Sequence, residues 1–123
     1  MKKVVLIDDN VEFNATLKEF LELEDFEVIS AFDGTQGLSL IYQEKPDLII
    51  TDIIMPEMEG IELLDQLTKY RLQCPTKIIA ISGGGRIGAQ QYLEFAKEIG
   101  ADYVFDKPLK FKEFINAIRE LLD

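Results

Sequence analysis

Five short apolar runs alternate along this sequence with segments in which apolar residues recur at helical spacing. The runs are Lys3–Ile7, Phe26–Ser30, Leu48–Thr51, Lys77–Ile81 and Tyr103–Phe105. Continuous apolar runs of this length predict strands that are buried on both faces, and strands that alternate with helices predict a parallel sheet. The sequence therefore predicts an α/β fold: a doubly wound five-stranded parallel sheet with the flavodoxin-like order 2-1-3-4-5 and helices on both faces.

Five helices are expected between and after these runs. Their apolar faces are Phe13/Leu17/Phe20/Leu21, Leu38/Ile41/Tyr42, Ile61/Leu64/Leu67, Tyr92/Phe95/Ala96/Ile99 and Phe111/Phe114/Ile115/Ile118. Asn10 is placed to cap the first helix and Gly100 to end the fourth. These units use the whole chain, so we expect a single domain spanning residues 1–123.

Composition excludes several classes of function. With 13 basic and 23 acidic residues the formal charge is −10, which argues against direct binding to nucleic acid. There is no histidine, so imidazole triads and most transition-metal sites are excluded. The single cysteine, Cys74, cannot form an internal disulfide, and a reducing, cytoplasmic location is expected. No apolar run approaches the roughly 18 residues of a membrane span.

Carboxylates follow two of the predicted strands. Asp8 and Asp9 come directly after the first strand, and Asp52 comes directly after the third. In the order 2-1-3-4-5 these strands are neighbours, about 4.8 Å apart, and their carboxyl ends lie at the switch point where such folds bind ligands. Three clustered carboxylates repel one another unless a cation joins them, and oxygen ligands favour Mg²⁺. The alternative is an acidic rim without a metal.

Ser82 and Lys107 follow the fourth and fifth strands and reach the same rim. Taken singly, each could be a turn serine or a solvated lysine. Together with the carboxylates and Mg²⁺, a hydroxyl and an ammonium would cradle a phosphoryl group while a carboxylate attacks phosphorus.

These residues form a set that is similar to a known family over the whole chain. In their order and spacing they resemble the receiver domain of two-component response regulators: Asp8-Asp9, Asp52-Ile53-Ile54-Met55-Pro56 with Gly60, Ser82, and Lys107-Pro108. The resemblance implies that the chain is a phosphoacceptor rather than an enzyme that turns over a substrate. The phosphoryl donor would be a histidine of a partner sensor histidine kinase or histidine phosphotransferase.

The resemblance also implies a role for each site residue. Asp52 would be phosphorylated, and Asp9, Asp52 and the backbone carbonyl of Ile54 would ligate Mg²⁺ directly, with Asp8 acting through water. Lys107 would pair with the acyl phosphate, and the Lys107–Pro108 bond is expected to be cis. The Ser82 hydroxyl would move toward the phosphoryl group.

Phosphorylation would switch the face formed by the fourth helix, the fifth strand and the fifth helix for binding to an output protein. Val104 occupies the usual position of the switch aromatic, which departs from the family pattern. Basic residues on or near this face form either a solvated fringe or a docking patch for an acidic partner: Lys97, Lys110, Lys112 and Arg119. Donor docking is expected around the first helix, near Asn10, Val11, Asn14 and Lys18, and on the loop after Lys107.

Several alternatives remain open. The chain ends at Asp123, directly after the fifth helix, which favours a stand-alone regulator of chemotaxis type unless it is part of a longer one. A phosphorelay intermediate would instead pass the phosphoryl group onward. Ile54 and Gly84 cannot orient a hydrolytic water, so slow self-dephosphorylation is expected.

Two alternatives belong to other classes. An aspartate-nucleophile phosphatase of the dehalogenase type requires a second acid two residues after the nucleophile, where this sequence has Ile54. A flavodoxin-like electron carrier would bind a flavin phosphate at its first loop, but here the loop begins with Asp8 and Asp9 and would repel it.

Overall fold

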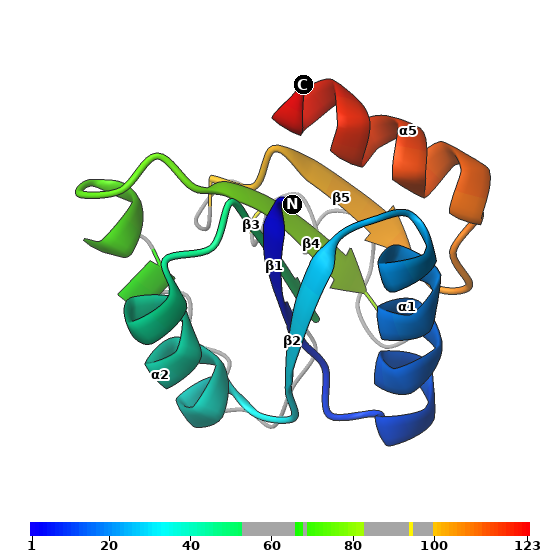
Figure 1. Cartoon of the computed structure of the whole chain (residues 1–123). Coiled ribbons are helices and arrows are strands. Elements are labelled where there is room, and N and C mark those ends of the chain that lie inside the picture. Colours follow the sequence, from blue (N-terminus) through cyan, green and yellow to red (C-terminus); the bar gives the residue numbers. More distant parts are fainter. Residues whose placement is uncertain (53–65, 68, 83–93, 95–99) are drawn as a thin grey trace.

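The strands of the protein form one parallel sheet in a computed structural model that describes residues 1–52, 66–67, 69–82, 94 and 100–123. The strands are β1 (Lys3–Ile7), β2 (Glu27–Ala31), β3 (Leu48–Asp52), β4 (Lys77–Ser82) and β5 (Tyr103–Asp106). They lie in the order β2-β1-β3-β4-β5, and every neighbouring pair is parallel (Figure 1). The predicted sheet and its strand order are confirmed.

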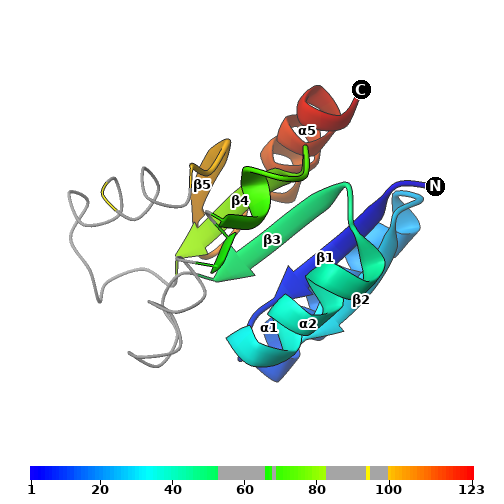
Figure 2. The same cartoon turned by 90° about the vertical axis from the view of Figure 1, so that its left-hand side faces the viewer.

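Helices cover both faces of this sheet. The complete helices among the described residues are α1 (Val11–Leu23), α2 (Gly34–Glu44) and α5 (Phe111–Leu122), and residues 66, 67 and 69–71 are also helical. Helices α1 and α5 lie on one face, and α2 lies on the other with the helical residues that precede β4 (Figures 1 and 2). Within the described ranges, no helix has the length and apolar character needed to span a membrane.

Each face of the sheet has its own hydrophobic core, because strand side chains point alternately to opposite sides. On the α2 side the buried core is Val5, Ile7, Ala31, Ile41, Ile49, Leu67, Tyr70, Ile78 and Ala80. On the α1 and α5 side it is Val4, Leu6, Leu17, Leu21, Phe26, Val28, Leu48, Ile50, Ile79, Ile81, Phe114, Ile115 and Ile118. The apolar runs of the sequence are thus strands buried on both faces.

Capping residues fix the ends of the helices. Asn10 caps α1, as predicted, because its side-chain oxygen accepts a hydrogen bond from the Phe13 amide at 3.0 Å. The turn after α1 passes through Asp25, which has a positive φ of 70°, and the Phe26 amide then donates to the carbonyl of Leu21. Phe26 therefore closes the turn that follows the helix, and β2 begins one residue later than the sequence predicts.

Two predicted helix faces differ from the structure. Tyr42 was expected on the inner face of α2, but it is 47% exposed and its ring packs edge-on against Tyr70. Phe111 is 37% exposed and stacks on Phe20 at the border of the core, with 4.6 Å between the ring centroids. Of the third and fourth predicted faces, only Leu67 lies among the described residues, and it is buried. The other positions lie outside the described residues: Ile61, Leu64, Tyr92, Phe95, Ala96 and Ile99.

Candidate functional site

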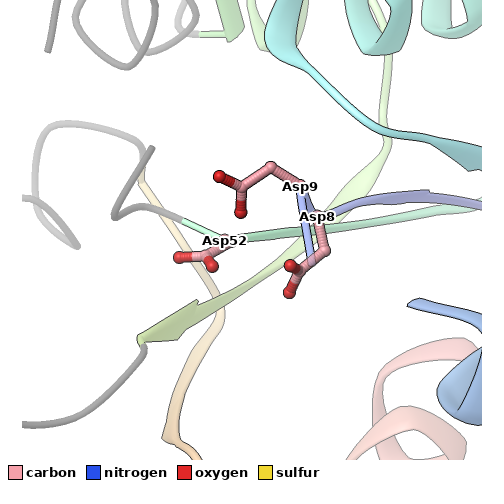
Figure 3. Close-up of side chains that lie close together, drawn as sticks. All are labelled: Asp8, Asp9 and Asp52. Carbon is pink, nitrogen blue, oxygen red and sulfur yellow. The ribbon is translucent and has the colours of Figure 1, made fainter. Parts of the chain in front are cut away.

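The carboxyl ends of β1 and β3 bring three carboxylates together. Ile7 lies opposite Thr51 in the register of the two strands, so the residues that follow them, Asp8 and Asp52, are also neighbours. One oxygen from each of Asp8, Asp9 and Asp52 lies within 4.8 Å of the others (Figure 3). We call these three residues the acidic cluster.

The members of the acidic cluster differ in burial. Asp8 and Asp52 are 1% and 4% exposed, whereas Asp9 is exposed. Asp8 is held by both its side chain and its backbone. Its Oδ1 accepts a hydrogen bond from the Asn10 amide at 2.8 Å, and its own amide donates to the Ala31 carbonyl at 3.1 Å. Asp8 is therefore fixed in place before any ligand binds.

Lys107 reaches the acidic cluster from the end of β5. Its Nζ lies 2.8 Å from Oδ2 of Asp8 and 3.1 Å from Oδ2 of Asp52, and its side chain is only 19% exposed. The bond from Lys107 to Pro108 is cis, which confirms that prediction. One ammonium thus bridges the two buried carboxylates.

The pKa of Lys107 reflects these neighbours. Burial lowers the pKa, but the hydrogen bond to Asp8 and the charge and hydrogen bond of Asp52 outweigh it, so the pKa is raised above the ordinary value of 10.5. The ammonium is therefore charged throughout the physiological pH range.

Ser82 is the last residue of β4, the strand that neighbours β3. Where β4 pairs with β5, Ser82 lies opposite Asp106. Where β4 pairs with β3, Ile81, the residue before Ser82, lies opposite Asp52. The backbone of Ser82 is thus at the same edge of the sheet as the acidic cluster. Other residues named from the sequence lie outside the described residues: Ile54, Gly60, Gly84 and Lys97.

On β5, side chains alternate between the two faces of the sheet. Tyr103 and Phe105 are partly buried and pack against the core on the α1 and α5 side, whereas Val104 is 37% exposed. The side chain at the usual position of the switch aromatic is therefore small and partly open to solvent. Nearby, Lys110 and Lys112 are exposed, and Arg119 forms an ion pair with Glu24 at the end of α1.

A buried polar network that contacts the backbone of Asp8 was not predicted from the sequence. Asn14 is fully buried; its side-chain nitrogen donates to the carbonyls of Asp8 and Ala31, and its oxygen accepts from the Ser30 hydroxyl. The prediction that Asn14 belongs to a docking surface on α1 is therefore wrong. Helical spacing could have indicated that Asn14 is buried, since it lies about one turn before the buried Leu17.

The donor set of the acidic cluster fits a hard divalent cation. Three carboxylates carry three negative charges, and the Lys107 ammonium offsets only one of them. Oxygen ligands at this spacing suit Mg²⁺, which is bound by one or two carboxylates and keeps several waters. Asp9 is the most accessible of the three carboxylates for a cation that arrives from solvent.

The sequence of the chain is similar to those of known proteins. Residues 4–119 match the family described as the response regulator receiver domain. The transcriptional regulatory protein CpxR of Escherichia coli strain K12 is 36% identical over 122 residues, which are 99% of this chain and 50% of CpxR. CpxR of Klebsiella pneumoniae is 34% identical with the same coverage. The chain thus spans about half the length of these curated relatives.

Solved structures share the fold over the whole chain. A CheY-like response regulator receiver domain protein from Methanospirillum hungatei is 31% identical with a TM-score of 0.85, covering 100% of this chain and 94% of that one. The response regulator TrrA from Thermotoga maritima, solved in complex with Mg(2+)-BeF, is 27% identical with a TM-score of 0.82. That match covers 99% of this chain and 100% of TrrA.

Proposed function

Since the chain belongs to the family of response regulator receiver domains, which are the phosphoacceptors of two-component signalling, we propose that Asp52 is its phosphorylated residue. The observation that carries this proposal is the convergence of Asp8, Asp9, Asp52 and Lys107 at the carboxyl edge of the sheet. Asp52 ends β3 with its carboxylate beside the Lys107 ammonium, which suits a nucleophile that must meet an anionic group.

The other two carboxylates are less suited to nucleophilic attack. Both oxygens of Asp8 are engaged, Oδ1 with the Asn10 amide and Oδ2 with the Lys107 ammonium. Asp9 is exposed, and Lys107 forms its ion pairs with Asp8 and Asp52 rather than with Asp9. A carboxylate surrounded by water lacks the electrostatic preorganisation that stabilises a transition state.

The phosphoryl donor would be a phosphohistidine of a sensor histidine kinase or histidine phosphotransferase, because this chain has no histidine of its own. A carboxylate oxygen of Asp52 attacks phosphorus, a P–O bond forms, and the P–N bond of the donor breaks. The leaving imidazole nitrogen takes up a proton. The Lys107 ammonium pairs with the phosphoryl oxygens during and after transfer, and the Ser82 hydroxyl hydrogen-bonds to the product.

Mg²⁺ is the cofactor of this proposal. Asp9, Asp52 and the backbone carbonyl of Ile54 would hold it directly, and Asp8 would act through a water molecule. When bound, Mg²⁺ supplies positive charge that offsets the carboxylates and the phosphoryl oxygens. The relative TrrA was solved in complex with Mg(2+)-BeF, which supports the choice of Mg²⁺ as the cation.

The output would be carried by the face that includes β5 and α5. Phosphorylation adds about −1.5 to −2 charge and strong acceptor oxygens, which can draw the Ser82 hydroxyl toward Asp52 and change that face for partner binding. CpxR is a transcriptional regulatory protein and about twice as long, so the output of a chain like this one can lie in further sequence or in a separate protein. Onward transfer in a phosphorelay remains the second form of this function.

Intact mass spectrometry tests the proposal. The protein is mixed with a small acyl phosphate, with and without Mg²⁺, beside the variants Asp52→Asn and Asp106→Asn. Asp106 is a matched control because it is an aspartate at the same edge of the sheet, at the end of β5. Wild type and Asp106→Asn should gain one phosphoryl group only with Mg²⁺, and Asp52→Asn should gain none. A normal mass gain in Asp52→Asn would refute the assignment of Asp52.

A further inference from the structure

The ammonium of Lys107 also contacts an aromatic ring. Its Nζ lies 4.2 Å from the centroid of the Phe13 ring. Phe13 is in the first turn of α1, whereas Lys107 follows β5, so the contact joins two distant parts of the chain. The ring therefore belongs to the surroundings of the same ammonium that bridges Asp8 and Asp52.

Hydrogen bonds from backbone amides to side-chain oxygens fix the place of the Phe13 backbone. The Phe13 amide donates to Oδ1 of Asn10 at 3.0 Å, and the Asn10 amide donates to Oδ1 of Asp8 at 2.8 Å. Since Oδ2 of Asp8 pairs with Lys107 at 2.8 Å, the contacts close a circuit through Asp8, Asn10, Phe13 and Lys107. The backbone from which the ring extends is thus held at a set position relative to the carboxylate that Lys107 contacts.

An aromatic ring can hold a lysine in a way that an aliphatic side chain cannot. The lysine side chain is long and flexible, and the ammonium loses rotamer freedom when it is held in one place. The face of an aromatic ring attracts a cation within about 6 Å of its centroid, more strongly where water is excluded. Lys107 is 19% exposed and Phe13 is partly buried, so this attraction acts in a mostly dry environment.

We propose that Phe13 is a positioning residue for phosphoryl transfer, whose ring holds the Lys107 ammonium at the acidic cluster, ready to meet the phosphoryl oxygens on Asp52. The inference rests on the proposed function above, in which Lys107 pairs with the phosphoryl group. Phe13 touches neither Asp52 nor the donor in this proposal. It acts only through Lys107.

Rates of phosphorylation by a small acyl phosphate at saturating Mg²⁺ test this role. The small donor is used because a partner protein could dock on α1 and contact Phe13 itself. Phe13→Leu, which keeps an apolar side chain but loses the ring, should react about three- to tenfold more slowly. Phe13→Tyr keeps the ring and should react at nearly the wild-type rate. Phe20→Leu is the matched control on α1, since Phe20 stacks on Phe111 instead.

A second background separates positioning from general packing. In Lys107→Met there is no ammonium to hold, so Phe13→Leu should cause no further loss of rate there. An equal loss of rate in both backgrounds would mean that Phe13 acts through the packing of α1, and the inference would be wrong.

An NMR measurement tests the contact without any reaction. Protons above an aromatic ring are shielded, so the ε-methylene resonances of Lys107 should lie upfield in wild type and Phe13→Tyr but not in Phe13→Leu. If wild type is phosphorylated on Asp52 and Phe13→Leu reacts at the same rate, only this inference fails. If wild type is not phosphorylated at all, the proposed function fails with it.

Discussion

The ammonium of Lys107 lies 2.8 Å from Oδ2 of Asp8, a carboxylate that is only 1% exposed. The same ammonium lies 3.1 Å from Oδ2 of Asp52, so one cation is shared by two buried carboxylates. A buried charge that loses its partner destabilises the folded state strongly. The site therefore links the stability of the protein to the residues proposed for phosphoryl transfer.

Replacing Lys107 by Met should lower the free energy of unfolding by about 3 kcal/mol, because Asp8 and Asp52 lose their counterion. Added Mg²⁺ should then stabilise Lys107→Met more than it stabilises wild type, since no ammonium competes for the carboxylates. Urea unfolding with and without Mg²⁺ measures both effects. Lys110→Met is the matched control, because Lys110 is exposed and makes no capping hydrogen bond at the start of α5. Equal stabilisation of Lys107→Met and wild type by Mg²⁺ would contradict this prediction.

Tyr103 should ionise at a higher pH than an isolated tyrosine. Its hydroxyl donates to Oε2 of Glu120 at 2.9 Å, and this hydrogen bond, with burial and the charge of Glu120, raises the pKa above the ordinary value of 10.0. Because the folded state holds the proton more tightly, the contribution to stability is complete below pH 10 and is lost as the pH rises through the raised pKa.

Absorbance of tyrosinate during an alkaline titration measures this pKa. Glu120→Gln should move one tyrosine titration to lower pH, because the negative charge that opposes ionisation is gone. The same change in a Tyr103→Phe background should leave the remaining titrations unchanged. A shift in that background would assign the effect to another tyrosine.

Asn14→Ala should lower the free energy of unfolding by about 2 kcal/mol. The change removes two buried hydrogen bonds, to the carbonyls of Asp8 and Ala31, and leaves the partly buried Ser30 hydroxyl without its acceptor. Asn116→Ala, at an exposed position of α5, should change it by less than about 0.5 kcal/mol. Similar urea midpoints for the two variants would show that the network contributes little.

Gly37 lies where α2 packs closely against β1. A Cβ at this position would lie 2.5 Å from Cδ1 and 2.7 Å from Cγ1 of Ile7, which is fully buried. Gly37→Ala gains helix propensity but overpacks the core, so we expect a net loss of about 1 kcal/mol in unfolding free energy. Adding Ile7→Val, which removes Cδ1, should make Gly37→Ala less harmful. If Gly37→Ala stabilises the protein, the close packing is not strained by a methyl group.

The architecture could be predicted because its signals are local. Each strand is a short apolar run, and the order of units along the chain fixes a parallel sheet whose switch point lies between β1 and β3. The same order brings Asp8 and Asp52 to neighbouring strand ends. The cap at Asn10 could also be predicted, since it depends on residues within one turn of helix.

What could not be predicted depends on side chains from distant elements. Asp52 follows β3, which lies closer to β5 in the sheet than β1 does, so strand spacing places Lys107 nearer to Asp52 than to Asp8. The flexible lysine side chain nevertheless carries the ammonium slightly closer to Asp8. The contact between Phe13 and Lys107 requires α1 and the end of β5 to meet at one edge, and no spacing within either segment encodes it. Tyr42 follows helical spacing, but its position at the border of the α2 face leaves it exposed.

The most direct test of the central claim is to locate the phosphoryl group in the sequence. The protein would be phosphorylated with a small acyl phosphate and Mg²⁺, reduced with borohydride to convert the aspartyl phosphate into homoserine, digested, and sequenced by mass spectrometry. We predict homoserine at position 52 alone, with Asp8 and Asp9 unchanged. Homoserine at position 8 or 9, or at no aspartate of the acidic cluster, would contradict the account.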